Sequence, residues 1–128
     1  MRIRTYQPGD ESDQARIYNE AAGSLPAFKP ASPEEILRRY QADDAGPGSR
    51  FYAEIDGEVV GYAVFCSNGR VNFPWCLPGA EIVRVPLLDA LFAEMGRRGL
   101  QEAWAAYRSD WSTVLDFFKD HAFSRNGR

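Results

Sequence analysis

In the first third of the chain, the spacing of apolar residues changes from the alternation of a strand to the period of a helix. Residues 2–7 alternate between two sides and run into a Pro-Gly turn. Residues 10–22 then carry apolar side chains at helical spacing. Further on, Ser32 is suited to cap a helix that has Pro33 as its first residue and Glu35 as its third, which is a capping box. The pattern predicts one strand followed by two helices.

The centre of the chain predicts an antiparallel meander of three strands. Residues 51–55, 59–67 and 70–75 are rich in β-branched and aromatic side chains. Asp-Gly at positions 56–57 and Asn-Gly at positions 68–69 separate them. Both dipeptides favour two-residue type I′ turns, because both central positions tolerate a positive φ.

The last part of the chain predicts a helix, a strand and a second helix. Residues 86–99 have an apolar stripe that must pack on the sheet, and they end in Arg-Arg-Gly, which suits a helix C-terminus. Residues 102–108 predict an alanine-rich strand. Residues 110–121 predict a helix with Val114, Phe117, Phe118 and His121 on one face.

Composition limits the classes of protein to which the chain can belong. Its 128 residues are 45% hydrophobic and contain no repeat or linker, so we expect a single domain over residues 1–128. The net charge of −3 comes from mixed charges without a long basic run, which argues against nucleic acid as a partner. Without an apolar leader or about 18 consecutive apolar residues, we expect no membrane partner and a cytoplasmic location.

The cysteines and the histidine are expected to be structural. The second turn would place Cys66 opposite Val71, which leaves Cys76 beyond the Cα separation of about 4.4 to 6.8 Å that a disulfide needs. Two free thiols follow. We expect His121, the only histidine, to pack or cap near the end of its helix. Acidic, histidine and cysteine residues do not reach metal-ligand spacing, so no metal is expected.

Two segments, taken in this order of elements, resemble the GNAT N-acetyltransferase superfamily. Residues 55–63 (Ile-Asp-Gly-Glu-Val-Val-Gly-Tyr-Ala) are similar to its second hairpin. Residues 115–123 (Leu-Asp-Phe-Phe-Lys-Asp-His-Ala-Phe) are similar to its last helix and terminal Gly-Phe. The resemblance covers nearly the whole chain. It implies an α/β (α+β) fold, a mixed and mostly antiparallel central sheet flanked by about four helices, with the last strands missing.

The resemblance also implies acyl transfer from acetyl-CoA to an amine. In that family two strands splay apart so that pantetheine can bond to exposed backbone, and N–H groups at the next helix N-terminus hold the pyrophosphate. Here the splay would fall between residues 73–76 and 103–107, with Pro74 marking the bulge or edge that opens it. The residues expected to bind the cofactor are Phe73, Trp75, Cys76, Ala80, Ile82, Val83, Arg84 and Val85.

The loop before the helix at 86–99 departs from the family pattern. Aligning the family's leucine pair with Leu87 and Leu88 puts Gly79 where the family has arginine or glutamine. The same alignment puts Ile82 and Arg84 where the family has glycines. A β-branched residue is costly where the backbone needs a positive φ or close approach to phosphate.

Other substitutions affect the charge of the loop and the proton donor. Glu81 adds an anion and Pro86 removes an amide donor, whereas Arg84 can supply a charge-assisted contact. In the last helix, Phe118 stands where many family members have the tyrosine that protonates the leaving thiolate. Trp111 stands at the family's asparagine position.

Three functions stay open. The first is a divergent acetyl-CoA-dependent N-acetyltransferase with direct attack by a small-molecule amine, for which Tyr107 and Glu54 are the candidate proton carriers. The second is a noncatalytic, degenerate GNAT-like module that has no small-molecule substrate and acts as a structural or dimerisation half. The third is a small-molecule binder that keeps the cleft and has lost CoA.

The C-terminal end of the resemblance bears on partners. Family members continue past the final Gly-Phe with about two more strands, so the fifth strand would be an edge with unpaired backbone groups. Three explanations stay open: one half of a tandem GNAT protein, another subunit that covers the edge, or a truncated chain. The partner expected is a second copy of the chain or a second GNAT-like domain.

Overall fold

The computed structural model describes residues 1–121 and shows a mixed α/β domain. The strands are β1 (Arg2–Thr5), β2 (Arg50–Ile55), β3 (Glu58–Val64) and β4 (Trp75–Cys76). The helices are α1 (Asp10–Ala22), α2 (Pro33–Gln41), α3 (Arg84–Arg97) and α4 (Ser112–Asp120), with 3-10 turns η1 (Pro47–Ser49) and η2 (Glu81–Val83). The strands form one antiparallel sheet in the order β1-β2-β3-β4. The predicted fold class is confirmed.

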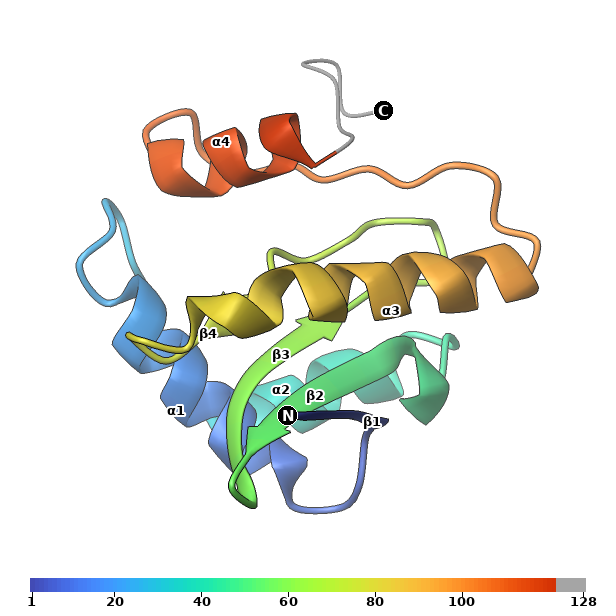
Figure 1. Cartoon of the computed structure of the whole chain (residues 1–128), viewed down its shortest axis with the longest axis horizontal. Coiled ribbons are helices and arrows are strands. Elements are labelled where there is room, and N and C mark those ends of the chain that lie inside the picture. The colour runs from blue at the N-terminus through green and yellow to red at the C-terminus, as the bar shows by residue number, and fades with distance from the viewer. Residues whose placement is uncertain (122–128) are drawn as a thin grey trace.

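The helices lie in layers around the sheet. Helix α3 crosses one face, helices α1 and α2 cover the other, and α4 lies beyond α3 on the far side from β1 (Figure 1). Helix α3 buries Leu87, Leu88, Leu91 and Met95 against the sheet, so its predicted apolar stripe is confirmed. Burial of this kind contributes roughly 1.5 to 3 kcal/mol for each large apolar side chain.

Two predicted helix ends are confirmed in atomic detail. The Ser32 hydroxyl caps α2 by accepting the Glu35 N–H at 3.2 Å. At the end of α3, Gly99 has a φ of +76° and its N–H donates to the Gly96 carbonyl at 3.1 Å. The Leu100 N–H donates to the Met95 carbonyl at 3.0 Å, which completes a Schellman motif.

One of the two predicted hairpin turns is right and the other is wrong. Asp56 and Gly57 have φ values of +53° and +80°, as a type I′ turn requires. At the second turn only Gly69 has a positive φ, and the Cys66 N–H donates to the Arg70 carbonyl at 2.9 Å. The loop therefore has three residues, with Gly69 as the left-handed residue of a bulge. Cys66 faces Arg70, and not Val71 as predicted.

The strand predicted at residues 70–75 is interrupted. Phe65 pairs with Val71 and Tyr62 with Trp75, so residues 63 and 64 face residues 72–74. The extra residue is a β-bulge at this point, where Pro74 was expected to mark one. Only the end of the segment, β4, continues as a regular strand.

The strand predicted at residues 102–108 is wrong. The segment makes one parallel bridge, between Arg70 and Trp104. Trp104 accepts from the Val71 N–H at 2.7 Å and donates to the Gly69 carbonyl at 3.0 Å. The following residues are not paired with the sheet as a strand, and the Tyr107 hydroxyl instead accepts a hydrogen bond from the Phe73 N–H.

Candidate functional site

The outer edge of β4 carries backbone groups that point away from the sheet. The Leu77 N–H donates to the Val60 carbonyl at 2.9 Å, and Trp75 pairs with Tyr62. Since antiparallel strands alternate, the backbone groups of Cys76, between these two positions, face the opposite side. Pro74, one step before Trp75, has no N–H to offer there. The bulge and β4 thus leave a short backbone edge without a regular strand partner, although the residues that form it are buried.

A tyrosine side chain contacts this backbone edge. The Phe73 N–H donates to the Tyr107 hydroxyl oxygen at 2.7 Å. The Tyr107 ring stacks between Trp111 at 6.0 Å and Phe118 at 5.9 Å, measured between ring centroids. Burial raises the pKa of Tyr107 to about 12, so the phenol is neutral at pH 7. A backbone donor beside the bulge is therefore already satisfied by a side chain.

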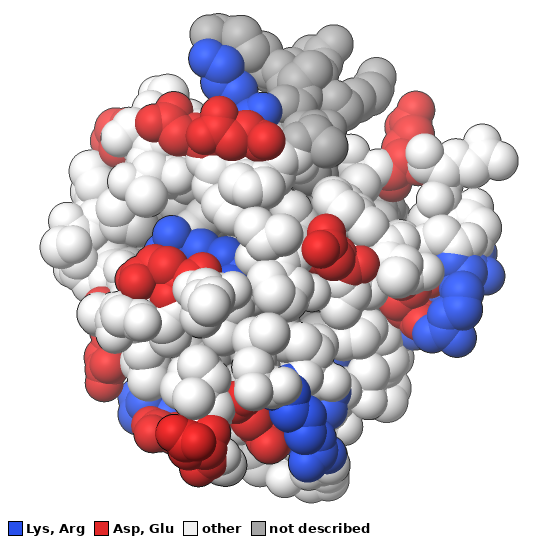
Figure 2. Space-filling model, in the orientation of Figure 1, with Lys and Arg blue, Asp and Glu red and all other residues white. Residues whose placement is uncertain are grey.

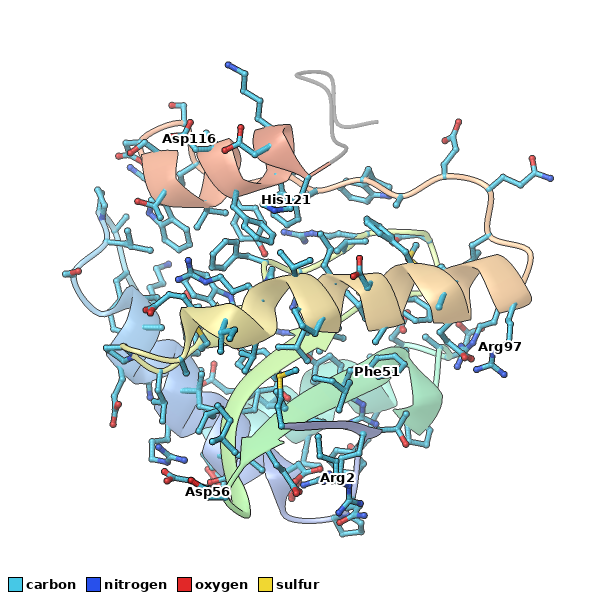
Figure 3. All side chains as sticks on the ribbon, in the orientation of Figure 1. Arg2, Phe51, Asp56, Arg97, Asp116 and His121 are labelled. Atoms are coloured by element: carbon cyan, nitrogen blue, oxygen red, sulfur yellow. The ribbon has the colours of Figure 1, made fainter. Side chains whose placement is uncertain are left out.

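Aromatic rings from α4 and the preceding segment pack on the same edge. Phe73 meets Trp75 at 4.7 Å and Phe117 at 5.2 Å, both edge to face. Figure 3 shows side chains filling the space between α4 and α3, with His121 at the end of α4. His121 at the end of α4 stacks on Phe117 at 4.3 Å, and its Nδ1 lies 2.8 Å from the Phe117 carbonyl. The expected packing role of His121 agrees with this geometry.

The loop between α1 and α2 is tied to the aromatic cluster. The Trp111 indole N–H donates to the Pro26 carbonyl at 2.7 Å. Tyr18 of α1 meets Trp75 edge to face at 5.2 Å and Phe28 of the loop at 5.6 Å. These contacts close the side of β4 that lies toward α1.

The loop before α3 uses most of its own backbone donors. The Ala80 N–H donates to the Leu77 carbonyl at 2.9 Å and the Val83 N–H to the Ala80 carbonyl at 3.0 Å. The Arg84 N–H donates to the Glu81 carbonyl. The loop is therefore a compact 3-10 turn that runs into the helix, and the helix begins two residues earlier than predicted.

A carboxylate accepts a hydrogen bond from another backbone N–H group of this loop. The Gly79 N–H donates to the Glu81 side chain at 3.1 Å, and Gly79 has a φ of +89°. Hydrogen bonds from the backbone N–H groups of Glu81 itself and of Gly79 lower the pKa of Glu81. In this loop the N–H groups of Gly79, Ala80, Val83 and Arg84 therefore already have acceptors within the protein.

Arg84 points inward and does not extend over the loop. Its guanidinium lies 5.0 Å from the centre of the Phe73 ring, and its Nε is buried without a hydrogen-bond partner within the described chain. It also lies beside the Cys76 thiol. Burial raises the pKa of Cys76 despite this cation, so the thiol is protonated at pH 7 and is a poor nucleophile.

The structure brings only some of the candidate residues together. Phe73, Trp75 and Cys76 line the β4 edge and are at most 5% exposed, and Tyr107 joins them. In the loop, Ile82 is 76% exposed and Val85 41% exposed, whereas Ala80 and Val83 are buried.

Glu54 is not part of this arrangement. It lies on β2, with β3 between it and β4, and its carboxylate accepts from the Arg4 Nε at 2.5 Å. The Trp104 indole N–H donates to the Asn68 carbonyl at 3.1 Å. No pattern in the sequence indicated the bond between Tyr107 and Phe73. For Glu81 the sequence showed a nearby anion but not its bonds to the loop.

The described residues contain neither a metal-ligand cluster nor a disulfide. Within residues 1–121, no group of three or more histidine, cysteine, aspartate or glutamate side chains is placed to hold a metal ion. Cys66 and Cys76 are both free, as predicted. None of the helices described is long and apolar enough to cross a membrane. On the face in Figure 2, positive and negative side chains are interspersed among uncharged surface.

Comparisons with known proteins find similar structures but no similar family model or curated sequence. No model of a known protein family matches the chain, and no curated protein matches its sequence. Ard1 from Thermoplasma volcanium aligns with a TM-score of 0.80 and 20% identity, over 96% of this chain and 82% of its own. The structure of yncA from Salmonella typhimurium with its cofactor acetyl-CoA aligns with a TM-score of 0.76 and 22% identity, over 97% and 79%.

A third structure is a GNAT family acetyltransferase from Brucella melitensis in complex with acetyl-CoA. It aligns with a TM-score of 0.74 and 18% identity, over 98% of this chain and 83% of its own. At such identities the likeness shows the fold. The fold expected from the sequence is confirmed.

Proposed function

From the GNAT fold of the chain, we propose that it is an acetyl-CoA-dependent N-acetyltransferase that acts on an amine. The observation that carries this proposal is the bulge before β4. Beside it, the backbone groups of Cys76 face away from β3 and have no regular strand next to them, because residues 102–108 bridge only at Trp104. An unpaired backbone edge of this kind can pair with the amides of an extended ligand.

The residues around this edge fit an acyl thioester in part. Pantetheine would lie along Phe73, Trp75 and Cys76, and the pyrophosphate near the loop formed by residues 80–85. In that loop, the N–H groups of Gly79, Ala80, Val83 and Arg84 already donate to acceptors within the protein, which is why the fit is partial. When bound, acetyl-CoA supplies the activated acyl group that the amine attacks.

Tyr107 is the residue best placed to return a proton to the leaving thiolate. Its oxygen accepts from the Phe73 N–H at 2.7 Å, so its own proton is free to be donated elsewhere. Its ring stacks on Phe118, the position where the resemblance implies an acid. Because the pKa of Tyr107 is raised to about 12, the phenol keeps its proton at pH 7.

The test measures binding first and turnover second. We expect about 1 mM acetyl-CoA to raise the melting temperature, since a ligand at 100 times its Kd stabilises by about 2.7 kcal/mol. Released CoA is then measured by chromatography with a panel of small amines. No thermal shift and no CoA release would refute the proposal.

A second experiment tests the role of Tyr107. A general acid contributes about 10² to 10⁴ in rate, so Tyr107→Phe should lower kcat by at least about a hundredfold without raising KM for acetyl-CoA. Tyr18→Phe, in the same aromatic cluster, is the control and should leave kcat unchanged within about twofold. An unchanged kcat in Tyr107→Phe would remove Tyr107 from the proposed chemistry.

A noncatalytic module is the second candidate function, and two contacts favour it. The Glu81 carboxylate holds the Gly79 N–H, and the Tyr107 hydroxyl holds the Phe73 N–H. Both donors lie where a CoA ligand would need them. In this alternative the domain serves as a structural half, paired with a second copy or a second GNAT-like domain. Sedimentation analysis showing a stable dimer, together with no acetyl-CoA binding, would support it.

A further inference from the structure

Glu81 bends back over the loop that precedes α3. Its carboxylate accepts the Gly79 N–H at 3.1 Å, and its own backbone N–H adds a second hydrogen bond. The positive φ of Gly79, +89°, turns this N–H toward the side chain. A charged acceptor on backbone donors at the start of a helix is a favourable arrangement. The chain thus supplies its own anion at this point.

Within the described residues no cation forms an ion pair with this carboxylate, although the charge of Arg84 helps to lower its pKa. Arg84, the cation of the same turn, lies inward over the Phe73 ring at 5.0 Å. Within residues 1–121, Glu81 forms no ion pair of 4 Å or less. The next residue of the turn, Ile82, is 76% exposed and offers an apolar side chain. A phosphate that approaches this turn therefore meets a carboxylate and an alkyl group.

We propose that Glu81 is a specificity-determining residue, which disfavours thioesters bearing a pyrophosphate relative to thioesters that end at pantetheine. The inference rests on the proposed function, because it assumes that thioesters enter along β4. The physical reason is twofold. The carboxylate repels the phosphate charge, and it holds the Gly79 N–H that a phosphate oxygen would use. An uncharged pantetheine arm that stops short of this turn meets neither obstacle.

The experiment compares two thioesters on three proteins. Binding of acetyl-CoA and of S-acetylpantetheine is measured by calorimetry for the wild type, Glu81→Ala and Asp89→Ala. Asp89 is an exposed carboxylate of α3, so its removal makes the same change in net charge. We expect Glu81→Ala to bind acetyl-CoA at least about tenfold more tightly and S-acetylpantetheine within about twofold of the wild type. Asp89→Ala should change both by less than about twofold.

The outcomes separate this inference from the proposed function. If the wild type binds a thioester but Glu81→Ala gains no affinity for acetyl-CoA, the role of Glu81 is refuted and the proposed function stands. Equal gains for both thioesters, or an equal gain in Asp89→Ala, would also refute it. If none of the three proteins binds either thioester, the proposed function fails and this inference fails with it.

A ligand-free measurement checks the contact on which the inference depends. The amide resonance of Gly79 should follow the titration of Glu81, with an inflection below the ordinary carboxyl value of 4.5. It should lose this pH dependence in Glu81→Ala and keep it in Asp89→Ala. If the pH dependence of the Gly79 amide resonance is the same in the wild type and in Glu81→Ala, the inference is refuted whatever the binding results.

Discussion

Replacing Tyr107 with phenylalanine should destabilise the domain measurably, because it leaves a buried backbone donor unpaired. The Phe73 N–H donates to the Tyr107 hydroxyl at 2.7 Å, and Phe73 is 1% exposed, so water cannot replace the lost acceptor. An unsatisfied buried donor costs about 1 to 3 kcal/mol. The ring contacts with Trp111 and Phe118 remain, because phenylalanine keeps the same shape.

The expected change in melting temperature follows from the size of the chain. About 2.1 cal/mol/K per residue over 128 residues gives an unfolding entropy of about 0.27 kcal/mol/K. A loss of about 1 to 3 kcal/mol therefore lowers the melting temperature by about 4 to 11 °C, measured by calorimetry or circular dichroism.

A matched variant isolates the hydrogen bond from the aromatic packing. Tyr18 lies in the same cluster, with its ring 5.2 Å from that of Trp75, and its hydroxyl has no hydrogen-bond partner within residues 1–121. Tyr18→Phe should shift the melting temperature by less than about 2 °C. If both variants melt within 2 °C of the wild type, the bond between Tyr107 and Phe73 contributes nothing, and this reasoning is wrong.

Three further predictions concern packing, pH and a loop. Gly61→Ala should lower the free energy of unfolding by about 1 to 3 kcal/mol in urea titrations, because its Cβ would lie 2.8 Å from Val83 Cγ2; an unchanged midpoint would contradict the tight packing. Burial by itself raises the pKa of Asp10, but the hydrogen bonds from the Arg4 guanidinium and the Gln7 N–H outweigh it, so the net pKa lies below the ordinary 3.8. The stability from ionised Asp10 is present above that ordinary value and is lost as the pH falls through the lowered one, so Asp10→Asn should flatten the acid limb of a stability–pH profile. Trp111→Phe removes the 2.7 Å hydrogen bond to the Pro26 carbonyl, so limited proteolysis should cut residues 24–31 faster than in the wild type.

Local sequence signals predicted the helices better than the strands. A capping serine, an apolar stripe and a terminal glycine act within one helix, so the start of α2 and the buried face of α3 could be predicted, although α3 begins two residues before the predicted start. The turn predicted for Asn-Gly at positions 68–69 was wrong, because this dipeptide is compatible with both a two-residue turn and a three-residue loop. Only the paired strands decide between them, and here Gly69 approaches so closely that a Cβ would lie 2.5 Å from the Glu102 carbonyl oxygen.

The segments that form the candidate site could be proposed from the sequence, but the contacts that occupy them could not. Position along the fold located the edge at residues 73–76 and the loop at residues 80–85. The contacts that occupy them depend on tertiary structure: Tyr107 reaches Phe73 across 34 residues, and Arg84 turns toward the core instead of the loop. No pattern in the chain marks either contact. The sequence therefore indicated which cofactor to consider, whereas the contacts that occupy the candidate site could be seen only in the structure.

The single bridge at Trp104 has a consequence for hydrogen exchange. Residues 101–111 and α4 join the rest of the domain through two backbone hydrogen bonds at Trp104, side-chain hydrogen bonds at residues 104, 106, 107 and 111, and ring contacts. Strands β2 and β3 are instead paired along their whole lengths, with one irregularity between Ala53 and Glu54. Such a segment opens at a lower free energy than the rest of the domain, so its amides should exchange as one early group while those of β2 and β3 wait for global unfolding. The wall of the proposed binding site would then be less protected than β2 and β3, and a ligand could enter through a partial opening of this segment alone.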